Sequence, residues 1–197
     1  MSILFSPQRK VSLQNFNDRN RHKSAIVWLT GLSGSGKSSI AIEIHHKLFK
    51  CGYNSFVLDG DLLRLGLNSD LSFSVPDRKE NIRRAAQVAN LFFDAGFIVL
   101  CSFISPFEED RKTAREVTPA NGFFEIYVQC SIEECISRDP KNLYKRAMNG
   151  EIESFTGISS PYEVPKEPDL IINSEYQSVE SSSNIIISLL KDKRIIN

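Results

Sequence analysis

Residues 31–38 read Gly-Leu-Ser-Gly-Ser-Gly-Lys-Ser and match the phosphate-binding pattern G-x-x-x-x-G-K-[ST] at every fixed position. The apolar run 25–30 before this stretch is typical of a buried strand, and the apolar residues between 40 and 48 recur at helical spacing. A glycine-rich turn between a strand and a helix lets backbone N–H groups face an anion, and the helix N-terminus adds partial positive charge. A glycine-rich turn without a ligand is the alternative, but this context predicts a nucleoside triphosphate site.

Every residue of this loop is a candidate for ATP binding. Lys37 is expected to reach the β- and γ-phosphates and is therefore also a candidate catalytic residue. The Ser38 hydroxyl is the candidate ligand of Mg²⁺. The predicted cofactors are ATP and Mg²⁺, and the predicted binding residues are Gly31, Leu32, Ser33, Gly34, Ser35, Gly36, Lys37 and Ser38.

The composition favours a single enzyme domain with a small anionic substrate. The 197 residues fit one α/β domain, and 24 basic residues balance 24 acidic ones, so nothing indicates a nucleic-acid partner. No run approaches the roughly 20 apolar residues of a membrane span, so no membrane association is expected. The four cysteines form no C-x-x-C pair, which favours buried thiols in a reducing compartment.

Residues 1–24 are predicted to form a surface arm ahead of the domain at 25–197. This arm has five basic residues and only one acidic residue and weakly resembles a transit peptide, but it lacks the apolar stretch of a secretory signal. We therefore expect a cytoplasmic protein.

Strand-like and helix-like segments alternate after the phosphate loop. This alternation predicts the α/β class and a P-loop NTPase fold, in which a parallel five-stranded sheet is flanked by helices. Ligands of such sheets bind beyond the carboxyl ends of the strands. The polar segment 139–168 interrupts the alternation, and a long loop over the phosphates, acting as a lid, is the preferred interpretation. The expected strands are 25–30, 55–59, 97–102, 123–129 and 170–172; a long helix is expected from the Ser74–Asp77 cap to Gly96, and a final helix around 185–190.

The sequence Asp59-Gly60-Asp61 places two carboxylates at a strand end. One carboxylate can take or orient the acceptor proton during phosphoryl transfer while another group holds the metal. A solvated Asp-Gly turn is the alternative. The guanine-reading motif Asn-Lys-x-Asp of many GTPases is absent from the sequence, which favours a kinase.

Arginines and aromatic residues downstream suit an anionic nucleotide as the acceptor. Guanidinium groups bind oxyanions in a forked geometry, and Arg64, Arg78, Arg83 and Arg84 lie close together in the sequence. Phe73 and Phe155 lie in polar loops, where either a stacked purine or core packing would explain an aromatic ring.

Together these motifs resemble the adenylylsulfate kinase family, whose members phosphorylate the 3′-hydroxyl of adenosine 5′-phosphosulfate (APS) with ATP. The resemblance spans roughly residues 25–172 in the order of the family. The matching blocks are the phosphate loop, Leu58-Asp-Gly-Asp61, Gly66-Leu-Asn68, Asp77-Arg-Lys-Glu-Asn-Ile-Arg-Arg84, Ser102-Phe-Ile-Ser-Pro106, Arg138-Asp-Pro-Lys141, Leu143-Tyr-Lys145, Phe155-Thr-Gly157 and Pro161-Tyr-Glu163.

The resemblance implies roles for individual residues. Asp61 lies near the reactive 3′-hydroxyl in such kinases and would orient or deprotonate it. Phe73 and Phe155 would sandwich the adenine of APS. The remaining contacts to APS or to the lid are assigned to Asp59, Arg64, Arg78, Asn81, Ile104 and Lys141. A homodimer is also implied.

Two matters stay open from the sequence. Ser105 either forms a phosphoserine intermediate or is a loop serine beside the acceptor, since in-line transfer needs no covalent intermediate. Ser72 and Ser159 stand where the family usually has Gly and often has Asp. The alternatives to an APS kinase are therefore a 3′-kinase of another modified nucleotide and a nucleotide-binding module without catalysis.

Overall fold

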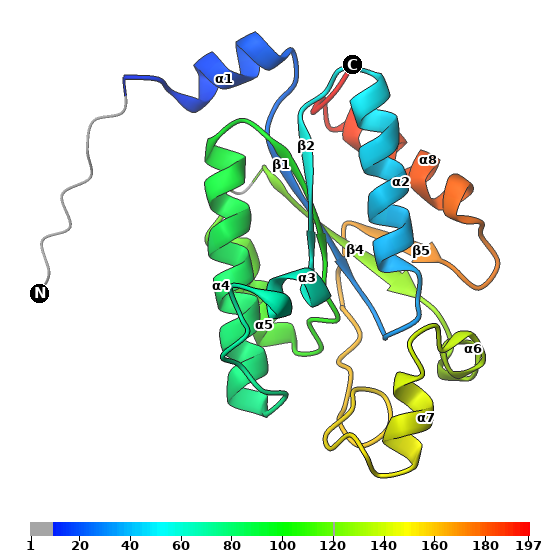
Figure 1. The fold of residues 1–197 in the computed structure, drawn as a ribbon. Coiled ribbons are helices and arrows are strands. Elements are labelled where there is room, and N and C mark those ends of the chain that lie inside the picture. Colours follow the sequence, from blue (N-terminus) through cyan, green and yellow to red (C-terminus); the bar gives the residue numbers. More distant parts are fainter. Residues whose placement is uncertain (1–9, 120) are drawn as a thin grey trace, which may run out of the picture.

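A computed structural model describes residues 10–119 and 121–197 (Figure 1). Its centre is a five-stranded sheet in the order β2-β3-β1-β4-β5, and every neighbouring pair is parallel. The strands are β1 (Ala25–Thr30), β2 (Ser55–Asp59), β3 (Ile98–Ser102), β4 (Phe123–Gln129) and β5 (Leu170–Asn173). The predicted parallel α/β sheet is confirmed, and the predicted strand limits differ by one residue at the start of β3 and at the end of β5.

The central strand β1 is buried along its whole length, as its apolar sequence predicts. Ala25 pairs with Ile98 of β3 on one side, and Ile26 pairs with Phe123 of β4 on the other. Because all five strands run the same way, their carboxyl ends meet at one edge of the molecule. The chain leaves β1 at this edge and enters the phosphate loop.

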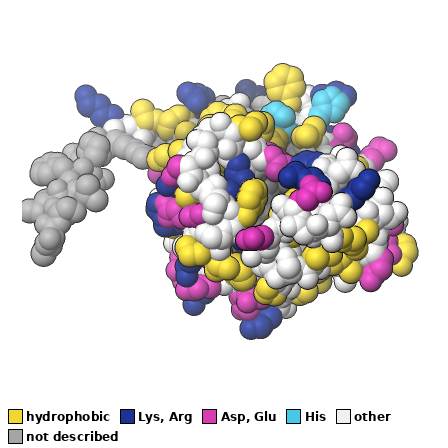
Figure 2. Space-filling view, turned by 60° about the horizontal axis from the view of Figure 1, so that its bottom comes forward, with side chains coloured by type: hydrophobic (Ala, Val, Ile, Leu, Met, Phe, Trp, Pro, Cys, Tyr) yellow, Lys and Arg dark blue, Asp and Glu magenta, His cyan; other side chains and the backbone are white. Residues whose placement is uncertain are grey.

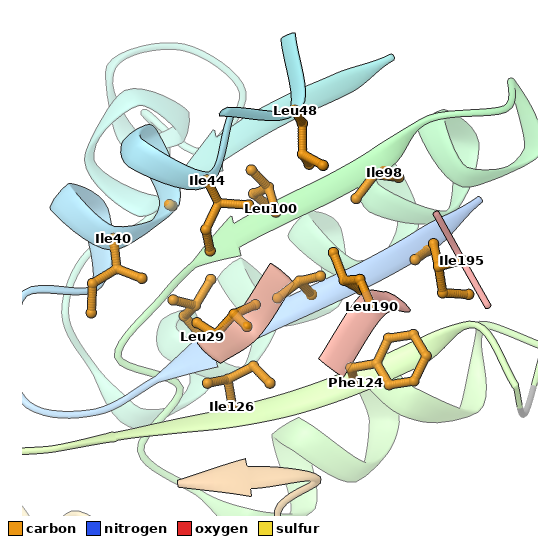
Figure 3. Packing of buried hydrophobic residues seen from close by; sticks show 14 of the residues in the cluster. Leu29, Ile40, Ile44, Leu48, Ile98, Leu100, Phe124, Ile126, Leu190 and Ile195 are labelled. Carbon is orange, nitrogen blue, oxygen red and sulfur yellow. The ribbon is translucent and has the colours of Figure 1, made fainter. Parts of the chain in front are cut away.

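Two helices, α2 (Lys37–Lys50) and α8 (Val179–Asp192), cover one face of the sheet. Ile40, Ile44 and Leu48 recur along α2 at intervals of four residues and point toward the sheet (Figure 3). Leu190 of α8 enters the same cluster. This packing fixes the first turn of α2 relative to the end of β1.

The opposite face is covered by α4 (Val75–Asp94) and α5 (Glu108–Glu116). Ser74 caps α4 by accepting a hydrogen bond from the Asp77 N–H, and Pro76 lies in the first turn, as the sequence predicts. The Trp28 ring stacks between Phe103 and Phe123 at centroid distances of 4.9 and 5.9 Å.

The chain ahead of β1 contains a helix, α1 (Leu13–Asn20), inside the predicted surface arm. Asn20 Nδ2 donates to the Gly96 carbonyl over 2.9 Å. A Cβ on Gly96, whose φ is +90°, would lie 2.7 Å from Phe16 Cβ, so a glycine is required there. The arm is therefore packed onto the turn between α4 and β3, and its first nine residues lie outside the described part.

Short helices follow strands β2, β3 and β4 at the carboxyl edge of the sheet. Among them, α3 (Gly60–Leu65) directly follows β2, whereas α6 (Ile132–Arg138) and α7 (Leu143–Met148) follow β4. The segment 139–168, expected to be a long loop, contains the helix α7. The Asp139 carboxylate accepts hydrogen bonds from the N–H groups of Tyr144 and Lys145, at 3.1 and 3.0 Å, and so stabilises the start of this helix. Over residues 10–119 and 121–197, no helix is long and apolar enough to cross a membrane.

The buried His22 makes the stability of this fold depend on pH. Its Nε2 accepts the Asn54 N–H over 3.1 Å, so Nδ1 carries the proton and donates to the Lys23 carbonyl over 3.0 Å. Burial lowers the pKa of His22 below its usual value of 6.5. Below about pH 6.5 the unfolded chain therefore takes up a proton that the folded protein resists, and stability is lost as the pH falls.

We predict that the free energy of unfolding in urea decreases between pH 7.5 and 5.5, in part because of this residue. The decrease should be smaller in His22→Gln. The exposed His46 provides the matched control, since His46→Gln should keep the wild-type dependence. An identical pH dependence in wild type and His22→Gln would contradict the assignment.

Candidate active site

The predicted site residues lie at the carboxyl edge of the sheet, where the phosphate loop, the end of β2, the start of α4 and the segment after β4 meet (Figure 1). Figure 2 views the molecule with this end brought forward. Basic and acidic side chains are interspersed there, in agreement with the balanced charge of the sequence. Among the described residues on this face, the basic side chains do not form one broad patch.

The phosphate loop needs glycine at the points where it meets the rest of the protein. A Cβ on Gly31 would lie 2.5 Å from the Val128 carbonyl oxygen of β4, and Gly31 has a φ of +152°. Gly34, at φ +77°, faces the backbone of Cys135 in α6, whose carbonyl oxygen would lie 3.1 Å from an added Cβ. The loop is thus closely seated against β4 and α6, which preorganises its backbone N–H groups.

Lys37 is buried beneath this loop. Its Nζ donates to the carbonyl oxygens of Gly31 and Leu32, at 3.0 and 2.7 Å. Burial lowers the pKa of the ammonium to about 8, and the carboxylate of Asp59 acts in the opposite direction. The Lys37 ammonium is therefore bonded to neutral carbonyl oxygens, and the charged oxygens of a phosphate would be stronger acceptors.

Ser38 joins the phosphate loop to the end of β2. Its Oγ donates to Asp59 Oδ2 over 2.6 Å and lies 3.0 Å from the Ser102 Oγ at the end of β3. The described residues contain no group of three or more His, Cys, Asp or Glu side chains suited to a metal. Mg²⁺ bound to a nucleotide takes few protein ligands and prefers oxygen, so this hydroxyl–carboxylate pair fits that ion.

The second carboxylate of the pair, Asp61, is largely exposed. Its N–H donates to Asp59 Oδ1 over 3.0 Å, which places Asp61 in the first turn of α3 beside Asp59. Its carboxylate forms an ion pair with Lys141, which lies between α6 and α7. The structure thus brings Asp59, Asp61 and Lys141 together, although 80 residues separate the last two.

Arg78 connects the two loops that carry the predicted stacking rings. From α4 its Nε donates to the Phe73 carbonyl over 2.8 Å and its Nη1 to Thr156 Oγ1 over 2.6 Å. Its Nη2 also donates to the Ser154 carbonyl. Because a guanidinium has five N–H groups, two remain for an anionic ligand.

The two rings themselves differ in environment. Phe73 is 56% exposed, and the Arg64 guanidinium lies 4.3 Å from its ring centroid. Phe155 is only 7% exposed and packs edge-on against Tyr144, with centroids 5.0 Å apart. The Phe73 ring is exposed, whereas the Phe155 ring forms part of a small apolar cluster with residues of α6 and α7.

Ser105 is oriented into the core rather than toward the phosphate loop. It is 1% exposed, its Oγ accepts from Trp28 Nε1 over 3.1 Å, and it donates to Thr30 Oγ1 over 2.9 Å. This orientation favours the loop serine over the phosphoserine intermediate. Of the other candidates, the Ile104 carbonyl accepts from Thr30 Oγ1 over 2.7 Å, and Asn81 Oδ1 accepts from Asn68 Nδ2 over 2.9 Å.

Several residues of this edge were not recognised from the sequence as part of the site. Tyr162 lies 3.0 Å from Thr30 through its hydroxyl, and the Arg111 Nη1 donates to the Ser105 carbonyl over 2.8 Å. Tyr144 donates to the Ser33 carbonyl of the phosphate loop over 2.9 Å. The motifs Leu143-Tyr-Lys145 and Pro161-Tyr-Glu163 carried the only sequence signal for the two tyrosines. Arg83 and Arg84 instead pair with Glu80 on the surface of α4.

A phosphate loop between a parallel strand and a helix, with carboxylates at the neighbouring strand end and a covering segment after β4, defines a P-loop kinase. Comparison with known proteins narrows this class. Residues 23–173 match the model of the family described as adenylylsulphate kinase. The chain belongs to the adenylylsulfate kinase family.

Individual relatives agree over nearly the whole chain. A protein of Halalkalibacterium halodurans named probable adenylyl-sulfate kinase is 54% identical over 98% of this chain and 92% of its own length. The adenylyl-sulfate kinase of Staphylococcus haemolyticus is 50% identical over 95% of this chain and 94% of its own. The structure of the APS kinase of Mycobacterium tuberculosis in complex with AMPPNP and APS has a TM-score of 0.83 and 47% identity, covering 86% of this chain and 99% of that one.

We predict that Ser105→Ala keeps kcat within about threefold of wild type, because a buried hydroxyl facing Trp28 and Thr30 takes no part in transfer. The variant should instead be less stable by about 1–3 kcal/mol, since the buried indole N–H loses its acceptor. Steady-state kinetics and urea unfolding measure the two effects. A loss of turnover by several orders of magnitude in a folded variant would restore the covalent route.

Proposed function

We propose that this protein transfers the γ-phosphoryl group of ATP to the 3′-hydroxyl of APS, giving 3′-phosphoadenylyl sulfate and ADP, in cytoplasmic sulfate activation. The observation that carries the proposal is the Asp59-Gly60-Asp61 turn. One of its carboxylates accepts from Ser38 of the phosphate loop, and the other pairs with Lys141 of the lid. The family and the APS-bound relative support the choice of acceptor.

On the donor side, the backbone of residues 31–38 binds the ATP phosphates, and Lys37 exchanges its carbonyl partners for phosphate oxygens. Ser38 Oγ, backed by Asp59, holds Mg²⁺. That ion would supply positive charge that neutralises the charge developing during transfer.

On the acceptor side, Phe73 stacks on the adenine of APS, with Phe155 as the second wall of the pocket. Arg64 and the two remaining N–H groups of Arg78 bind the phosphosulfate. Asn81, the backbone of Ile104 and Lys141 complete the contacts. The distance between the two loops is set by Arg78, which is bonded to the backbone of both.

The chemical step needs little more than alignment. Asp61 accepts a hydrogen bond from the 3′-hydroxyl and directs its oxygen at the γ-phosphorus. The bond from this oxygen to phosphorus forms while the bond to the β,γ-bridging oxygen breaks, and the hydroxyl proton passes to the Asp61 carboxylate. Once Asp61 is protonated, the Lys141 ammonium is free to interact with the negatively charged phosphoryl group being transferred.

The decisive experiment measures ADP formation with Mg-ATP fixed and the acceptor varied. We expect a preference of at least about 100-fold in kcat/KM for APS over AMP, ADP and cytidine nucleotides. AMP and ADP lack the sulfate that the phosphosulfate contacts would bind, and cytidine nucleotides lack the adenine as well. Turnover only with another nucleotide would overturn the acceptor and keep the kinase chemistry. No ADP with any acceptor would overturn the kinase.

The matched control for this experiment is Asp61→Asn, which keeps the size of the side chain and removes its charge. Its kcat with APS should fall by about 10²-fold or more, while the KM for ATP changes little. A wild-type kcat in the Asp61→Asn protein would show that the measured activity does not depend on this site.

We further propose a homodimer, on the resemblance to the family. Light scattering at micromolar concentration should then give twice the 22.3 kDa of one chain. A mass of one chain across the concentration range would contradict it.

A further inference from the structure

Tyr144 contacts both of the proposed substrate sites. It lies in α7 and is 1% exposed. Its hydroxyl donates to the Ser33 carbonyl in the phosphate loop over 2.9 Å. The edge of its ring packs against Phe155 at an interplanar angle of 81°. One side chain therefore links the donor loop to a wall of the acceptor pocket.

The position of Tyr144 is fixed by its own surroundings. Its N–H is bonded to the Asp139 carboxylate, and its ring lies in the apolar cluster of Cys130, Cys135, Ala147 and Phe155. Burial raises the pKa of its hydroxyl, so the group stays a donor at physiological pH. Because the ring is rigid and its hydroxyl remains a donor, a displacement of Ser33 at the hydroxyl is transmitted to Phe155 at the ring.

Both ends of this link belong to elements that bind ligand. At one end, Ser33 lies between Leu32, whose carbonyl holds Lys37, and Gly34, which is seated on α6. At the other end, the residues flanking Phe155, Ser154 and Thr156, are bonded to Arg78 of the acceptor pocket. A phosphate loop settled around ATP thereby fixes the Tyr144 hydroxyl, and a fixed Tyr144 ring fixes Phe155.

We propose that Tyr144 is a positioning residue that couples the two sites, so that a nucleoside triphosphate in the phosphate loop raises the affinity of the acceptor pocket for its nucleotide. The coupling acts through the Tyr144–Ser33 hydrogen bond and the Tyr144–Phe155 contact. This inference rests on the proposed function. By thermodynamic reciprocity, the acceptor raises the affinity for the triphosphate by the same factor.

The test is calorimetric titration of APS into the full chain, with and without saturating Mg-AMPPNP. The ratio of the two dissociation constants is the coupling factor. In Tyr144→Phe the ring contact with Phe155 stays and only the bond to Ser33 is lost. We expect the affinity for APS alone to stay within about twofold, and the coupling factor to fall by about threefold to tenfold, which is the range for one neutral hydrogen bond.

Tyr53→Phe is the matched control, because the Tyr53 hydroxyl also bonds to a backbone carbonyl, that of Asn197, over 3.3 Å. It lies between α2 and β2, at the opposite edge of the sheet, and its coupling factor should equal that of wild type. Thermal unfolding of both variants checks that their folds are equally stable. A general loosening of the protein would reduce the coupling in both.

Three results would overturn the proposal. A wild-type coupling factor of one would show that the sites are independent. An unchanged factor in Tyr144→Phe would show that the coupling runs elsewhere, and either result leaves the proposed function standing. No binding of APS to the wild-type protein under any condition would remove the proposed function and this inference together.

Discussion

The hydrogen bond from Ser38 Oγ to Asp59 Oδ2 is the contact on which the site depends. It ties the first turn of α2, the helix that follows β1, to the last residue of β2, and β3 lies between β1 and β2 in the sheet. A hydroxyl–carboxylate hydrogen bond of 2.6 Å sets the position of the phosphate loop relative to the carboxylates of Asp59 and Asp61. Because Asp61 N–H is bonded to the same Asp59 carboxylate, the proposed base takes its position from this bond as well.

A second set of contacts anchors the far end of the lid. Thr30 ends β1 and meets the Ser105 and Tyr162 hydroxyls, while the Glu163 N–H donates to the Pro106 carbonyl over 2.8 Å. Ser105 has a φ of +38°, an uncommon conformation for a residue with a side chain. It is stabilised here by buried hydrogen bonds from both sides. The segment proposed as the lid is thus attached at the end of β1, and the hydrogen bonds of Ser105 belong to this attachment.

How far the sequence predicts this protein depends on the range of the signals. The strands were predicted to within one residue because a buried parallel strand needs a continuous apolar run, as in β1. The phosphate loop is equally local, since its glycines and Lys37 act within eight residues. By contrast α5, α6 and α7 were not predicted, because short polar helices depend on tertiary contacts such as the Asp139 cap of α7. The sequence left core packing and a stacked purine open for Phe155, and the burial of Ser105 could not be predicted because it depends on the distant Trp28.

Ser72 and Ser159, two of the positions that depart from the family pattern, lie beside the proposed stacking rings. The N–H and hydroxyl of Ser72 both donate to the Asp77 carboxylate, which lowers the pKa of Asp77. The Ser159 hydroxyl accepts the Phe155 N–H over 2.9 Å. Each serine therefore braces the turn that carries one ring, where a glycine at 72 would leave the backbone freer. The hydrogen bonds of both serine hydroxyls go to the Asp77 carboxylate and the Phe155 N–H, not to the phenyl rings. The substitutions thus change how firmly the walls of the acceptor pocket are held, and they leave the groups that would read the base and the phosphosulfate in place.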